Sequence, residues 1–103
     1  MLKKTIILST VLVSSLVVAD DSAEVKALKK DMPQDVVAII DRTVQCNHWQ
    51  GEDTTDKARA DKINKELEKW KCSQIAKDQD AVSKLYQNDY AVKKRIQDAQ
   101  YIF

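Results

Sequence analysis

Apolar residues recur at steps of three and four along most of the chain after residue 33, which is the spacing of amphipathic helices. No stretch alternates with the two-residue period of a strand, and glycine and proline are nearly absent between residues 52 and 103. The pattern therefore predicts an all-α fold, a small array of about four helices. The first is expected from Pro33 to about Trp49, and the second is expected to end near Lys71. The apolar stripes are Val36, Val37, Ile40 and Val44; Ala60, Ile63, Leu67 and Trp70; Ile75, Val82, Leu85 and Tyr86; and Val92, Ile96, Ala99 and Phe103.

The helix ends are predicted from residues that commonly cap helices. Gly51 is the only glycine of the chain and sits where the first helix must stop, so we expect it to form a left-handed C-cap with positive φ. Thr54 or Thr55 is expected to cap the second helix. Ser73 and Asn88 are expected to cap the third and the fourth helix. These residues place the turns between the helices.

The first 19 residues have the pattern of a cleavable signal peptide. Lys3 and Lys4 precede an uncharged stretch, Thr5 to Ala19, whose last residues Val-Val-Ala form a plausible cleavage site. The stretch is about 15 residues long and a bilayer span needs roughly 20, so no stable membrane span is expected after cleavage. The sequence thus predicts a periplasmic or secreted protein.

Two cysteines are expected to stabilise the exported chain. Residues 20–32 are charged and small and are predicted to be a flexible lead or a frayed helix, and residues 33–103 are predicted to form one helical domain. About 84 mature residues bury so little surface that the core alone is only marginally stabilising. Because export favours oxidation, Cys46 and Cys72 are predicted to form a disulfide that clips the helices together.

The charge balance and the absence of catalytic motifs narrow the function classes. Signal cleavage removes Lys3 and Lys4 and takes the basic residues from 17 to 15 against 16 acidic ones, a net charge near −1. Such a mixture without a basic run has no electrostatic footprint for nucleic acid. There is no glycine-rich phosphate loop and no H-E-x-x-H motif. We therefore expect no enzyme, no cofactor and no nucleic-acid partner.

One local cluster has the residue types of a site. His48, the only histidine, lies with Trp49, Gly51 and Glu52 at the end of the first predicted helix, beside Cys46. We interpret the cluster first as a structural joint and second as a binding surface. A zinc site would need four ligands and cysteines that are not oxidised, so no metal is predicted here. A metal-binding protein centred on His48 is kept as an alternative.

Further charged and aromatic residues lie beside the apolar stripes. Arg59 and Asp78 flank the second and third stripes, and we expect a structural ion pair of Arg59 with either Asp78 or Glu52. Trp70 fits the second stripe and is expected in the core. Trp49, at the turn, is expected either to pack in the core or to be a surface anchor for a partner.

The cluster also carries a resemblance to known proteins. The run Cys46 to Glu52, a C-x-H-W-x-G-E motif, resembles a group of small exported two-cysteine bacterial proteins of unassigned function. The stretch from Cys72 to Tyr86 is distantly similar to helical periplasmic lysozyme-inhibitor proteins. The sequence thus predicts an exported helical module that binds a protein or a cell-envelope component, with an inhibitor of a cell-wall hydrolase such as lysozyme as a further alternative. The residues beyond the motif that match the small exported two-cysteine proteins are Asp56, Arg59, Ile63, Cys72, Asp78, Leu85 and Tyr86.

Overall fold

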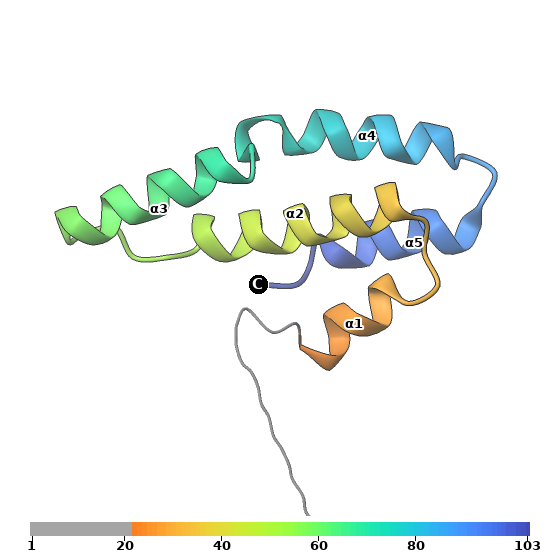
Figure 1. Ribbon diagram of the computed structural model, residues 1–103, viewed down its shortest axis with the longest axis horizontal. Helices are drawn as coiled ribbons and strands as arrows, with labels where there is room; N and C mark the ends of the chain where they lie inside the picture. Colours follow the sequence, from red (N-terminus) through yellow and green to blue (C-terminus); the bar gives the residue numbers. More distant parts are fainter. Residues whose placement is uncertain (1–21) are drawn as a thin grey trace, which may run out of the picture.

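The computed structural model describes residues 22–103, which form α-helices and one short 3-10 helix (Figure 1). No strand occurs in this part of the chain, so the predicted all-α fold is confirmed. The predicted signal peptide lies outside the described residues. None of the described helices is long and apolar enough to cross a bilayer. The elements are α1 (Ala23–Lys29), α2 (Gln34–Gln50), α3 (Lys57–Lys69), the 3-10 helix η1 (Cys72–Gln74), α4 (Ile75–Leu85) and α5 (Tyr90–Ala99).

Helix α2 is the centre of the fold, because every other helix packs against it. In Figure 1, α4 runs antiparallel to α2, while α5 passes on the other side of α2 and α1 lies below α5. Helix α3 is different: among the described elements it contacts only α2 and η1, and its first half projects past the end of α2 (Figure 1). The molecule is therefore a helical bundle with α3 as a projecting arm.

The core lies between α1, α2 and α5, with α4 packed at its edge. Ile40 and Ile96 are its largest fully buried side chains. Helix α3 adds only Ile63 to the buried residues of the molecule. The core cluster consists of Leu28, Val36, Ile39, Ile40, Val92, Ile96 and Ala99, with Met32, Val44, Ile75, Val82, Tyr86 and Ile102 partly buried against it.

Of the segment expected to be a flexible lead or a frayed helix, residues Ala23–Lys29 form the helix α1. Ser22 caps this helix, since its hydroxyl accepts a hydrogen bond from the Val25 N–H at 3.2 Å. Val25 and Leu28, three residues apart, lie on one face and are 4% and 8% exposed. Two apolar residues are too few to reveal a helix in the sequence, but they suffice here because α5 covers them.

The carbonyl groups at the ends of three helices are satisfied by side chains from other helices. The last carbonyls of a helix have no partner within it and need another donor. With one glycine in the chain, glycine C-caps cannot fill this need. Arg95 Nη1 serves α1, Asn47 Nδ2 serves the chain after α5, and Arg42 serves the end of α3. The acceptors are the carbonyls of Ala27, Leu28 and Lys30 for Arg95, of Ala99, Gln100 and Ile102 for Asn47, and of Trp70 and Lys71 for Arg42.

The prediction of a left-handed cap at Gly51 is wrong. Gly51 has φ −89° and ψ −2°, a right-handed conformation, and its N–H donates to the carbonyls of Asn47 and His48, each at 3.2 Å. The turn that follows is long enough for the chain to leave α2 without a reversal of handedness. Within residues 22–103, positive φ occurs at Asp31 (60°) and Lys71 (54°).

We expect Gly51→Ala to raise the free energy of unfolding by about 0.4–1 kcal/mol, because alanine restricts the unfolded chain and fits the native φ. An added Cβ would lie 3.5 Å from the Asn47 carbonyl oxygen and 3.7 Å from that of His48, which is ordinary contact. Urea denaturation checks this. A lower midpoint for Gly51→Ala than for the parent would contradict the right-handed conformation.

The predicted cap of the second helix is wrong. The N-cap of α3 is Asp56, and it makes no side-chain capping hydrogen bond. Thr55 does not cap; its N–H and hydroxyl donate to the carboxylate of Asp53 at 3.0 and 3.3 Å. Thr54 lies in the same exposed turn. The aspartate two residues earlier thus competes for the threonine that the sequence suggested as a cap.

The third and fourth caps are displaced by one residue. Ser73 lies inside η1, and the N-cap of α4 is Gln74. The N-cap of α5 is Asp89, whose carboxylate accepts from the Val92 N–H at 3.2 Å, so the predicted Asn88 is wrong. Asn88-Asp89 offers two good caps in sequence, and Asp89 has the side chain that reaches the helix amide.

Two positions of the predicted apolar stripes lie at the surface. Leu85 is 73% exposed and Phe103 is 82% exposed. The neighbouring Tyr86 and Ile102 pack against the core in their place. The Tyr86 hydroxyl donates to the Asp35 carboxylate at 2.8 Å, and this bond raises the pKa of Tyr86 above its usual value. Tyr86 belongs to the predicted stripe, whereas Ile102 and Phe103 both follow the end of α5 at Ala99.

Candidate functional site

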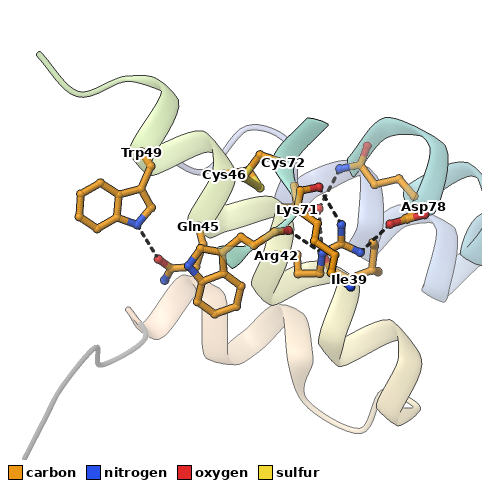
Figure 2. Close-up of a disulfide and its surroundings, with 11 residues drawn as sticks. Ile39, Arg42, Gln45, Cys46, Trp49, Lys71, Cys72 and Asp78 are labelled. Carbon is orange, nitrogen blue, oxygen red and sulfur yellow. Dashed lines mark hydrogen bonds and ion pairs between the residues drawn. A yellow bond between two sulfur atoms is a disulfide. The ribbon is translucent and has the colours of Figure 1, made fainter. Parts of the chain in front are cut away.

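A disulfide fastens the C-terminal end of α3 to α2. Cys46, in the last turns of α2, is bonded to Cys72 at the start of η1, with the two Cα atoms 5.5 Å apart (Figure 2). The two residues are 1% and 6% exposed. The predicted pairing is confirmed, and it holds α3 against α2 at one end only.

Arg42 reinforces the disulfide from one helical turn away (Figure 2). Its Nε donates to the Trp70 carbonyl at 2.9 Å and its Nη2 to the Lys71 carbonyl at 3.1 Å. Its Nη1 forms an ion pair with Asp78 on α4 at 2.9 Å. One guanidinium thereby joins α2, the end of α3 and α4. We call this set of contacts the Arg42 clamp.

The clamp also holds a left-handed residue. Lys71 has φ 54° and ψ 48°, a conformation that costs a residue with a side chain roughly 1–2 kcal/mol. This residue turns the chain from α3 into η1. The left-handed residue expected at Gly51 thus occurs at the other end of α3, where the disulfide and Arg42 enforce it.

Arg59 pairs with Glu52, and the alternative pair with Asp78 is wrong. Asp78 is bonded to Arg42 instead, so it does not belong to the cluster at the end of α2. Sequence reasoning did not single out Arg42. The signal that could have found it is a cation four residues before Cys46, on the face of the helix that carries the disulfide.

The other predicted joint residues come together where α2 ends. The His48 ring meets Trp49 edge to face, with centroids 4.9 Å apart. Glu52 pairs with Arg59, and its second oxygen lies 4.0 Å from His48 Nε2. The Trp49 Nε1 donates to the Gln45 side chain at 3.3 Å (Figure 2), which fixes the half-buried indole. Gly51 contributes its backbone, which ends α2 between Trp49 and Glu52.

A row of cations runs along one flank of α3. Arg59, Lys62, Lys65 and Lys69 follow at steps of three, three and four residues, which places them on one side of the helix. All four are exposed. In residues 22–103 no carboxylate lies within ion-pair distance of the three lysines. We call these four residues the basic row.

Each end of the basic row lies over a tryptophan. The Lys62 Nζ is 5.3 Å from the centre of the Trp49 ring, and the Arg59 Cζ is 5.9 Å from it. The Lys69 Nζ is 5.3 Å from the centre of the Trp70 ring. These are cation–π distances, which hold the cations and the indoles in fixed relative positions.

Trp70 is half-buried rather than fully in the core. It ends α3, and its indole Nε1 is buried without a hydrogen-bond acceptor. A groove of about 450 Å³ runs beside it between α2 and the end of α3. The walls of the groove are Gln34, Ala38, Asp41, Arg42, Lys69, Trp70 and Lys71.

The described residues contain no group of three or more His, Cys, Asp and Glu side chains close enough to share a metal ion. The nearest acidic neighbour of His48 is Glu52, which Arg59 already occupies. Both cysteines are in the disulfide. The metal-binding alternative therefore gains no support from this cluster.

Comparison with known proteins found no relative. No protein-family model matches the chain, and neither a curated protein nor a solved structure matches it.

Glu52→Ala is expected to lower the free energy of unfolding by about 1–2 kcal/mol, because it leaves the Arg59 guanidinium without its carboxylate. The Glu52 side chain is 26% exposed, so water screens only part of this pair. We expect a smaller loss for His48→Ala, whose side chain is 48% exposed. Urea denaturation in the presence of a chelator measures both, with Glu68→Ala on the same arm as a matched control. If all three variants unfold like the parent, the cluster is not a structural joint.

Proposed function

We propose that this protein is an exported, non-enzymatic helical module that binds a partner protein through the arm formed by α3. The observation that carries the proposal is the way the arm is built. The disulfide, the Arg42 clamp and the pair of Glu52 with Arg59 all fasten α3 to the bundle, yet Ile63 is its only fully buried side chain.

The energetics of the arm support a use outside the monomer. Ordering a residue costs roughly 1–2 kcal/mol of conformational entropy. Burying a side chain of the size of Ile63 contributes roughly 1.5–3 kcal/mol. Helix α3 has 13 residues, and besides Ile63 it has only half-buried apolar contacts such as Leu67. Helix α3 therefore adds little apolar burial to the stability of the bundle. A partner that binds the exposed flank of α3 gives a reason for the helix to be held in place.

Export is supported by the signal-peptide pattern of residues 1–19 and by the disulfide. Disulfides persist in the periplasm and outside the cell and are rare in the cytosol. The resemblance of the run Cys46 to Glu52 to small exported two-cysteine proteins agrees with this location.

The composition of the arm favours a protein as the partner. Tryptophan and arginine are enriched where proteins bind each other, and tightly bound interfaces centre on such residues. Here Trp49 is half-buried beside Arg59, so it is held in place yet reachable at the surface. Inhibition of a cell-wall hydrolase is one case of protein binding, and a lysozyme activity assay with the protein added tests that case.

Site-specific photo-crosslinking in intact cells tests the proposal. A photo-reactive phenylalanine derivative replaces Ala58, which is exposed on the flank of α3 that carries the basic row. The matched control is the same replacement at Ala81, an exposed alanine on α4. We expect one discrete crosslinked species from Ala58 and none from Ala81. No product from Ala58, or the same product from both positions, would overturn the proposal.

A further inference from the structure

We propose that the partner segment that docks on the arm is acidic and lies along the basic row, with its carboxylates against Lys62, Lys65 and Lys69. This inference rests on the proposed function and names the chemistry of the partner at the same surface.

The basic row carries more positive charge than the neighbouring carboxylates neutralise. Glu52 neutralises Arg59, whereas among residues 22–103 no carboxylate lies within ion-pair distance of the three lysines. Like charges three and four residues apart on a helix repel each other. Asp61 and Glu68 lie four and three residues from Lys65, and the half-buried Glu66 lies four residues after Lys62 and three before Lys69. None of these carboxylates is within ion-pair distance of a lysine of the row. An acidic partner can therefore supply the carboxylates that the three lysines of the row lack within the described residues.

The spacing of the cations along α3 matches the spacing of side chains on a second helix. From Arg59 to Lys69 the row covers ten residue steps, or about 15 Å along the helix axis. Acidic residues at steps of three and four on a partner helix repeat at the same spacing. A partner helix laid along α3 can thus bring one carboxylate to each lysine.

Two tryptophan rings lie against the lysines of the basic row. Lys62 and Lys69 each lie over an indole, and the Trp49 indole is fixed by Gln45. A carboxylate that approaches such a lysine is shielded from water on the indole side. Ion pairs strengthen as water is excluded, and side chains held in place in advance lose less entropy on binding.

The same geometry disfavours a membrane as the occupant. Membrane-surface helices insert apolar side chains between the lipid headgroups. Trp49 and Trp70 are half-buried beneath cations and do not protrude. The most exposed aromatic side chains, Tyr90, Tyr101 and Phe103, belong to α5 and the C-terminal segment and not to this arm.

Binding of a designed peptide tests the acidic segment. The probe is a helical peptide of about 15 residues with glutamates at the spacing of the row, and its twin carries glutamines at the same places. The protein is the parent, the row variant Lys62→Gln/Lys65→Gln/Lys69→Gln, or a control with the same charge change elsewhere, Lys26→Gln/Lys30→Gln/Lys77→Gln. The control changes one lysine on α1, the residue that follows α1, and one lysine on α4. Calorimetry or fluorescence anisotropy at low and high salt gives the affinities.

We expect the glutamate peptide to bind the parent and the control, to bind the row variant at least about tenfold more weakly, and to lose affinity in salt. Equal losses in the row variant and the control would overturn the inference, because net charge alone would then explain binding. Equal binding of the glutamine twin would overturn it as well.

The crosslink from Ala58 separates this inference from the proposed function. If the row variant still forms the Ala58 product at the parental yield, the arm binds a partner without the lysines, and the acidic segment is wrong while the proposed function stands. Loss of the product in the row variant and its retention in the control supports both. If the parent forms no product, the proposed function itself fails.

Discussion

Arg42→Met is expected to lower the free energy of unfolding by about 2–3 kcal/mol, because hydrogen bonds to charged groups contribute more than neutral ones and their loss leaves part-buried acceptors unpaired. Methionine keeps the apolar stem of the side chain and removes the guanidinium. The carbonyls of Trp70 and Lys71 then lose their donor, and Asp78 loses its ion pair. The Arg42 and Asp78 side chains are 22% and 33% exposed, so water replaces only part of what is lost.

Two further variants identify the cause of this loss. Arg42→Lys keeps the charge but cannot donate to three acceptors in a fixed fork, so we expect most of the loss to remain. Lys84→Met removes an exposed lysine whose side chain is 75% accessible and pairs with Asp80 one turn away, and such surface pairs contribute roughly 0.3–0.5 kcal/mol. Urea denaturation monitored by circular dichroism measures all three. An Arg42→Met variant within 0.5 kcal/mol, roughly the scatter of neutral surface changes, would show that the clamp does not stabilise the fold.

The helices could be predicted from the sequence because their signal is local. Apolar residues such as Ile40, Ile63 and Ile96 recur at helical spacing, and each is buried on the expected face. The disulfide could be predicted as well, because an exported chain with two cysteines has one possible pairing within itself. The pair of Arg59 with Glu52 is one of the two predicted alternatives. It could be predicted because the two residues are seven positions apart, on either side of one turn.

The contacts that end the helices could not be predicted, because they join residues far apart in the chain. Arg42 bonds a carbonyl 28 residues away, and the bonds of Asn47 and Arg95 span more than 50 residues. Local capping rules have no access to such donors. This is why Gly51, the best local cap in the sequence, is not used as a left-handed residue, while Lys71 is. The Arg42 clamp stabilises at Lys71 the left-handed backbone conformation that a glycine would adopt without such contacts.

Removal of the disulfide by Cys46→Ala/Cys72→Ala is expected to lower the free energy of unfolding by about 3.5 kcal/mol, the chain-entropy value for a closed loop of this length. The cysteines are 26 residues apart, and the loop contains the end of α2, the turn and all of α3. A domain of about 80 residues has a total stability of roughly 4–12 kcal/mol, so the disulfide is a large part of it. We expect the melting temperature to fall by roughly 15–25 °C.

The disulfide and the Arg42 clamp hold the same joint but act on different states, and urea denaturation distinguishes them. Loss of the disulfide lets the unfolded chain expand, so the dependence of the free energy on urea, the m-value, should rise as the midpoint falls. Loss of the Arg42 guanidinium removes contacts of the native state only, so the midpoint should fall at an unchanged m-value. Cys46 is fully buried, so alanine at this position also leaves a small void, and reduction of the parent with dithiothreitol gives the same comparison without a void. If the reduced parent keeps both its midpoint and its m-value, the disulfide does not stabilise this fold, and α3 is held by the Arg42 clamp and the pair of Glu52 with Arg59.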